Sequence, residues 1–177
     1  MAPGSSSALP GAAGRPARWE GLLHAVLTGA AGIIAYVPTQ VLGLQEGFWA
    51  AITAIAVMQG EWRSTWSTGR DQLLGAAIGG VVALATLLVA GKHIWSYGLA
   101  VALAVLGCSL IRVSSAGRLA GITATIILLV PAGSLTPAEV AFWRVSEVAW
   151  GVVVTVSLVW IVEWSRRRIG GGPAASG

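Results

Sequence analysis

Six apolar segments separated by short polar stretches make up most of this chain. They cover roughly Gly21 to Leu42, Phe48 to Gln59, Gln72 to Ala90, Ile94 to Ile111, Leu119 to Pro131 and Ala138 to Val162. Their apolar residues run continuously instead of alternating with polar ones, which favours membrane-spanning helices over the strands of a membrane barrel. We therefore predict an all-α membrane protein with six transmembrane helices.

The second and fifth segments are shorter than the other four. Each has a clean apolar run of about thirteen residues, whereas a helix needs about 20 to cross the hydrocarbon core of a bilayer. The second run ends at Gln59 and Gly60, and the fifth ends at Pro131. Either these helices end inside the protein, or the second continues through residues 60–64 at the interface and is an ordinary span.

The composition indicates that lipid surrounds the protein. Of the 177 residues, 55% are hydrophobic and 10% are charged, and the mean hydropathy is +0.77. Soluble domains average about 25% charged residues. The net charge of +4 is spread over the ends of the apolar segments, so it does not form a surface for nucleic acid. The single cysteine, Cys108, lies in an apolar run and gives neither a disulfide nor a zinc site.

The arginine positions predict the orientation of the chain. Nine arginines fall on one side if both termini are cytoplasmic: Arg15, Arg18, Arg63, Arg70, Arg112, Arg118, Arg166, Arg167 and Arg168. Cytoplasmic loops carry an excess of Lys and Arg, so we expect a multi-pass protein of the inner (plasma) membrane with both termini inside. Residues 1–18 are expected to be a disordered cytoplasmic tail, 19–165 the transmembrane domain, and 166–177 a basic and then disordered cytoplasmic tail.

The two halves of the chain resemble each other. Residues 52–54 and 122–124 both read Ile-Thr-Ala and lie in the two short segments. In the third and sixth segments an acid is followed by small residues at the same spacing, as Asp71, Gly75 and Gly79 and as Glu147, Gly151 and Thr155. Three spans per half make the halves face opposite ways. This pattern predicts an inverted repeat of three plus three helices, in which paired short segments mark the substrate site.

Arg144 is the candidate for binding a substrate carboxylate. It lies inside the sixth segment and shares one helical face with Glu147, Gly151 and Thr155. A cation at this depth is costly unless it is paired or faces water, and a guanidinium matches a carboxylate with two parallel hydrogen bonds. Glu147 would hold Arg144 in place, or accept a proton and couple transport to the proton gradient. The alternative is a structural Arg-Glu pair that locks the helix.

Further candidate residues have a functional and an ordinary interpretation. The hydroxyls of Thr53 and Thr123 would line a path, or bond to carbonyls of their own helices. Phe48 and Trp49 would stack on an aromatic substrate, or anchor the chain at the membrane interface. We expect these four residues, with Arg144 and Glu147, to bind substrate if the functional interpretation holds.

The remaining polar and small residues are assigned to the cytoplasmic side and to packing. Arg63, Arg70 and Asp71 are expected to form a cytoplasmic mouth that attracts anions, or only to set the topology. Gly75, Gly79 and Gly151 are expected to let helices pack closely. Glu46 and Glu163 lie at segment ends, where we expect them to be solvated.

The sequence contains no pattern typical of an enzyme. His24 and His93 are isolated, so we expect no metal site and no cofactor. There is no His cluster, no closely spaced pair of catalytic acids and no nucleophile with a base. We therefore predict a protein that is not an enzyme.

The run from Gly47 to Leu88 resembles the fusaric acid resistance (FUSC) and aromatic acid exporter family. The resemblance rests on Phe48-Trp49-Ala50, on Thr53 and Gln59 in the short segment, on the arginine-containing loop at 63–70, and on Leu74-Gly75 with Gly79. It extends over about Trp19 to Trp164, because GITATIILL, Arg144 and Gly151 are similar to the second half of the family's repeat.

This resemblance implies a six-helix unit that exports aromatic or other organic acids from the cell, or conducts organic anions as plant relatives do. Longer members carry two such units or an added soluble domain, whereas this chain has one unit. The resemblance therefore implies a homodimer or a partner membrane protein. The alternative function is a membrane subunit that does not transport and packs against a larger partner.

Overall fold

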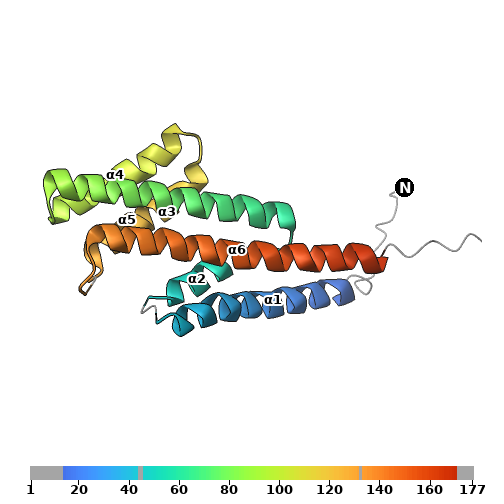
Figure 1. Ribbon diagram of the computed structural model, residues 1–177. Helices are drawn as coiled ribbons and strands as arrows, with labels where there is room; N and C mark the ends of the chain where they lie inside the picture. Colours follow the sequence, from blue (N-terminus) through green and yellow to red (C-terminus); the bar gives the residue numbers. More distant parts are fainter. Residues whose placement is uncertain (1–13, 44–45, 132, 171–177) are drawn as a thin grey trace, which may run out of the picture.

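The computed structural model describes residues 14–43, 46–131 and 133–170 (Figure 1). Within these ranges the chain is all helical. The helices are α1 (Gly14–Val41), α2 (Phe48–Val57), α3 (Trp62–Ala90), α4 (Ile94–Leu110), α5 (Ser114–Leu129) and α6 (Pro137–Gly170). Six helices in the predicted order confirm the helical class of the fold.

The second helix is short, as the apolar pattern predicted. α2 has 10 residues, which corresponds to about 15 Å at 1.5 Å per residue. It ends before residues 60–64, because Met58 is extended, with ψ of 116°. α5 has 16 residues and α4 has 17, so α5 is not exceptionally short. Only α1, α3 and α6 contain stretches long and apolar enough to cross a membrane by themselves among the described residues.

Several helices extend beyond the apolar segments from which they were predicted. α3 begins at Trp62, well before Gln72, α5 begins at Ser114, and α6 continues to Gly170. α1 begins at Gly14, inside the stretch expected to be disordered, whereas residues 1–13 and 171–177 lie outside the described residues. Polar first and last turns carry helical backbone without raising the local hydropathy, so the apolar pattern does not mark them.

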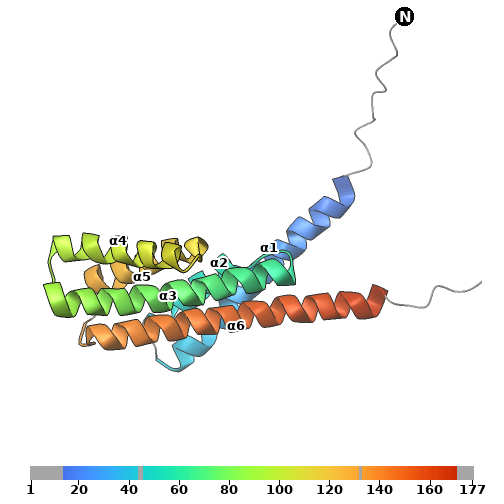
Figure 2. The same cartoon turned by 90° about the horizontal axis from the view of Figure 1, so that it is seen from above.

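The middle helix of each half packs on the last helix of the other half. α2 lies against α1 and α6, and α5 lies against α3 and α4, while α3 and α6 contact each other. The start of α1 and the end of α6 lie at one end of the molecule, and the α3–α4 link lies at the opposite end (Figures 1 and 2). The two halves are therefore interleaved in one bundle.

Glycines bring these helix pairs into backbone contact. A Cβ built on Gly75 would lie 2.6 Å from the carbonyl oxygen of Ala116 in α5, and one on Gly151 would lie 2.7 Å from the carbonyl oxygen of Ala50 in α2. A Cβ on Gly79 would collide with the carbonyl oxygen of Ala120, also in α5. The three glycines therefore pack helices closely, as the sequence predicted.

The same contacts correct the sequence match between the short helices. Thr155 donates to the carbonyl oxygen of Ala54 at 3.0 Å, at the place that Gly79 and Ala120 occupy in the other pair. In this packing, Ala54 of α2 has the same position as Ala120 of α5, and Thr53 of α2 has the same position as Leu119 of α5. The shared Ile-Thr-Ala letters instead relate Thr53 to Thr123, which is one helical turn away. Chance identity of apolar residues is the reason for this error.

Two long helices begin with different kinds of cap. In α6 the amide of Glu139 donates to Oγ1 of Thr136, and Oε2 of Glu139 accepts from the amide of Thr136 at 2.7 Å, which is a capping box. α3 has no cap from its own side chains. Its Trp62 amide donates to Oε1 of Glu163 in α6 at 2.7 Å. Glu163 is therefore a structural cap and not a fully solvated residue.

We predict that Gly79→Ala lowers the free energy of unfolding by about 1–3 kcal/mol, the usual cost of overpacking a core. The added methyl group meets the backbone of α5, which cannot rotate away. Gly98→Ala is the matched control, because a Cβ there meets nothing within 4 Å. Thermal unfolding in detergent, followed by circular dichroism, measures both changes. Equal stability of the two variants would contradict this packing.

Candidate functional site

Arg144 is buried between α6 and the first turn of α2. Its side chain is 6% exposed, and its guanidinium carbon lies 4.5 Å from the ring centre of Trp49. A cation over the face of an indole ring is an attractive arrangement. Glycine at position 151, two turns further along α6, lets α2 approach closely enough for this contact.

The partnership between Arg144 and Glu147 is loose. Nη1 of Arg144 lies 4.0 Å from Oε2 of Glu147, and Glu147 is also 6% exposed. Hydrogen bonds between nitrogen and oxygen have lengths of about 2.7–3.2 Å, so this is an ion pair without a hydrogen bond. Both side chains of this pair are nearly buried, so a structural role for it remains beside the binding role.

Three buried N–H donors meet here without an acceptor. Nε and Nη1 of Arg144 and Nε1 of Trp49 have no hydrogen-bond partner among the described residues. Buried polar groups in native proteins nearly always have one, and leaving a charged donor unpaired is especially costly. An anion or a water molecule that accepts hydrogen bonds from these three donors would complete the cluster.

Two more features surround this cluster. Glu46, in the link between α1 and α2, is half-buried, and its charge acts on both Arg144 and Glu147. A cavity of about 240 Å³ opens beside Glu147, between the end of α1 and the start of α6. It is lined by Pro38, Thr39, Leu42, Trp143, Ser146, Glu147 and Trp150. A hydrogen bond of 3.1 Å from Nε1 of Trp150 to the carbonyl oxygen of Ala35 joins α6 to α1.

The structure brings together some of the predicted substrate-binding residues. Arg144, Glu147 and Trp49 meet, and Thr53 lies one turn beyond Trp49, buried against Gly151. Thr123 is buried in α5, and no contact places it beside Arg144. Phe48 is 45% exposed, so its side chain points away from the cluster. The described contacts therefore centre on the start of α2.

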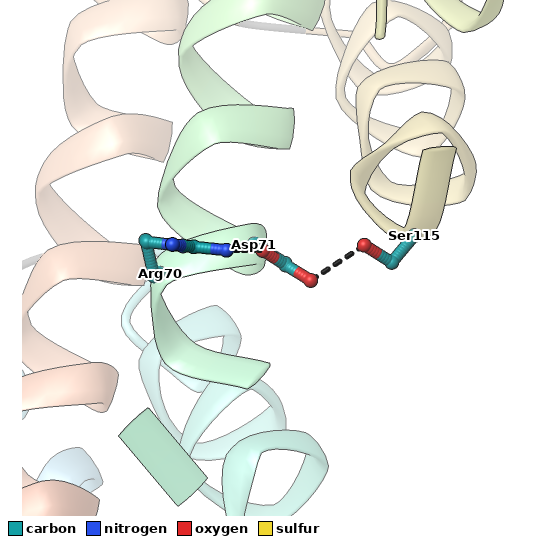
Figure 3. A network of polar contacts seen from close by, with 3 residues as sticks. All are labelled: Arg70, Asp71 and Ser115. Carbon is teal, nitrogen blue, oxygen red and sulfur yellow. Dashed lines mark hydrogen bonds and ion pairs between the residues drawn. The ribbon is translucent and has the colours of Figure 1, made fainter. Parts of the chain in front are cut away.

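In the predicted cytoplasmic mouth, the carboxylate of Asp71 in α3 lies at the amino end of α5. Oδ2 of Asp71 accepts a hydrogen bond of 2.5 Å from the hydroxyl of Ser115, in the first turn of α5 (Figure 3). A negative charge is favourable at a helix amino terminus. Arg70 lies 3.5 Å from Asp71 but is 60% exposed, so this ion pair adds little. Arg63 is exposed.

Sequence reasoning missed Ser115, the Glu163 cap and the proximity of Glu46. Ser115 precedes the apolar part of its helix, and a polar residue just before an apolar run is the signal that would have indicated a helix start. Glu163 and Glu46 act across helices, and no local pattern shows such contacts.

A second cavity, of about 330 Å³, lies between α1, the α2–α3 link and α6. His24, which the sequence set aside, lines it with Glu20, Glu61 and Glu163.

No group of three His, Cys, Asp or Glu side chains in the described ranges is placed to share a metal ion. The arrangement at Arg144 is suited to holding an anion by charge and hydrogen bonds. It does not offer a nucleophile with a base.

Comparison with known proteins agrees with this helical, apolar architecture. Residues 30–158 match the family described as fusaric acid resistance protein-like. No curated protein and no solved structure matches the chain. The matched region includes all of α2 to α5, the Arg144 cluster and most of α6. This is a family of membrane transporters with a role in efflux, and apolar helices long enough to span a bilayer fit that role. The chain, a multi-pass membrane protein, therefore belongs to the fusaric acid resistance protein-like family.

Proposed function

We propose that this protein exports organic acids, aromatic ones included, across the inner membrane and that Arg144 binds the carboxylate of the substrate. The observation that carries the proposal is the cluster of three buried donors without acceptors, two on Arg144 and one on Trp49. A carboxylate supplies acceptors for such donors. The cost of a buried cation without a hydrogen-bond partner is offset when the anion is bound.

The surroundings of Arg144 favour an organic anion with an apolar body. The nearby cavity is bordered by Trp143, Trp150 and Leu42 as well as Glu147. Binding sites for small molecules are mostly apolar with a few placed polar groups. In this proposal the carboxylate lies at Arg144 and Trp49, and the apolar part extends toward the cavity.

The interleaved packing supports an inverted repeat as the basis of transport. Gly75 meets α5 as Gly151 meets α2, and Asp71 and Glu147 precede these glycines by the same spacing. Repeats of this kind move substrates by rocking one bundle against the other around a central site. In this proposal both termini are cytoplasmic, and the Arg144 cluster lies in the outer half of the membrane.

The topology is tested with single cysteines at two exposed positions in a Cys108→Ala background. We expect His93→Cys to react with a membrane-impermeant maleimide on intact cells, and Ser64→Cys to react only after lysis. Position 64 lies in the first turn of α3 and position 93 lies just beyond its last residue, so the two positions mark opposite ends of this helix. Reaction of both positions on intact cells would contradict a crossing by α3, and the reversed pattern would place the termini outside.

We predict that Arg144→Gln reduces benzoate efflux from liposomes to the rate of empty liposomes. Losing the charge-assisted hydrogen bonds to a carboxylate removes about 1.5–3 kcal/mol for each, or at least tenfold in affinity. Arg144→Lys keeps the positive charge but cannot form two parallel hydrogen bonds to a carboxylate, and it should retain part of the activity. Efflux of labelled benzoate is measured against empty liposomes, which corrects for leakage of the neutral acid. Wild-type protein, shown to be folded, that transports none of a panel of acids would favour the accessory-subunit alternative.

Trp49→Phe is expected to weaken benzoate binding by about fivefold, because it keeps an aromatic face over Arg144 but deletes one N–H donor worth about 1 kcal/mol. Phe48→Leu is the matched control on the neighbouring exposed side chain and should leave the dissociation constant unchanged. Isothermal titration calorimetry in detergent measures both. A larger effect at Phe48 than at Trp49 would show that the wrong face of α2 had been assigned to the substrate.

A further inference from the structure

The charges around the donor cluster do not favour an anion when all of them are ionised. Arg144 contributes one positive charge, and Glu147 and Glu46 contribute one negative charge each. The unoccupied cluster therefore carries a net charge of minus one. A bound carboxylate would bring it to minus two in a region where Arg144 and Glu147 are almost fully buried, and the repulsion is strong where water is excluded.

A proton taken up with the anion removes this conflict. Neutralising one carboxylate restores a net charge of minus one with the substrate bound, and it leaves Arg144 free to pair with the substrate alone. The loose ion pair of 4.0 Å shows that Arg144 is not committed to Glu147 by a hydrogen bond. Anion and proton thus assist each other, because each lowers the cost of binding the other.

Glu147 is the better proton acceptor of the two acids. It is 6% exposed, whereas Glu46 is only half-buried, and burial disfavours the charged form of a carboxyl group. From α1 and the residue that follows it, the uncharged Pro38, Thr39 and Leu42 line the cavity that Glu147 borders. From α2, the nearby side chain is the neutral Trp49 over Arg144. The charged groups that act on Glu147 are therefore Arg144 on its own helix and Glu46 in the link.

We propose that an organic anion binds at Arg144 together with one proton, which Glu147 accepts. This inference rests on the proposed function. It gives the coupling at the binding step a sign, because proton and anion occupy the site at the same time.

The test is calorimetric titration of the purified full-length protein with benzoate from pH 5.5 to 9.5, where the ligand itself stays ionised. Buffers of different ionisation enthalpy report the number of protons taken up. We expect wild-type protein to take up as much as one proton per benzoate and to lose affinity by about tenfold per pH unit where Glu147 titrates, because the slope equals the number of protons bound. Glu147→Gln should still bind benzoate, with no proton uptake and no slope in this range.

Glu61→Gln, which removes an exposed carboxylate in the α2–α3 link, is the matched control and should keep both the proton uptake and the pH slope. Proton release, or pH-independent binding by the wild type, would overturn co-binding while leaving the proposed function intact. Loss of the slope in Glu46→Gln but not in Glu147→Gln would overturn the choice of acceptor. Complete absence of benzoate binding to folded wild-type protein would count against the anion site itself, and circular dichroism establishes folding for each variant.

Discussion

The backbone contact between α6 and α2 at Gly151 is the constraint on which the candidate site depends. Gly151 lies so close to the first turn of α2 that a Cβ would reach 2.7 Å from the carbonyl oxygen of Ala50. Ala50 follows Trp49 in the chain, so the distance between the two backbones also sets the distance between Trp49 and Arg144. Small residues permit such approach in membranes, where packing replaces the hydrophobic effect between helices. A larger residue at 151 would separate the indole ring from the guanidinium.

Burying Arg144 lowers the stability of the fold, because two of its donors have no hydrogen-bond partner among the described residues. Glu147, Trp49 and Glu46 each compensate part of the charge, yet the donors Nε and Nη1 remain without acceptors. A helix designed only for stability would carry an apolar residue at this position, because replacing buried ion pairs by apolar groups is often neutral or stabilising. In the proposed function, this cost is offset whenever an anion binds to the cluster.

The sequence predicted the features that depend on single segments. Apolar runs located all six helices, the break after Gln59 indicated the early end of α2, and spacing singled out Gly75, Gly79, Gly151 and Arg144. Features that depend on packing across helices stayed hidden, such as the Glu163 cap on α3 and the bond from Ser115 to Asp71. The register between the two short helices was misjudged because Ile-Thr-Ala is a weak marker in apolar sequence. Backbone contacts at glycine carry more information, because few residue types tolerate them.

The length of α6 has a mechanical consequence. One unbroken helix of 34 residues carries Arg144 near its beginning and, several turns later, the carboxylate that holds the amino end of α3. Gly151 lies between these points and provides a place without side-chain bulk about which the helix can pivot. A rigid rod that tilts about such a pivot moves its two ends in opposite directions. A small shift at the arginine would thus displace the amino end of α3 in the opposite direction, without any relay of side chains between them.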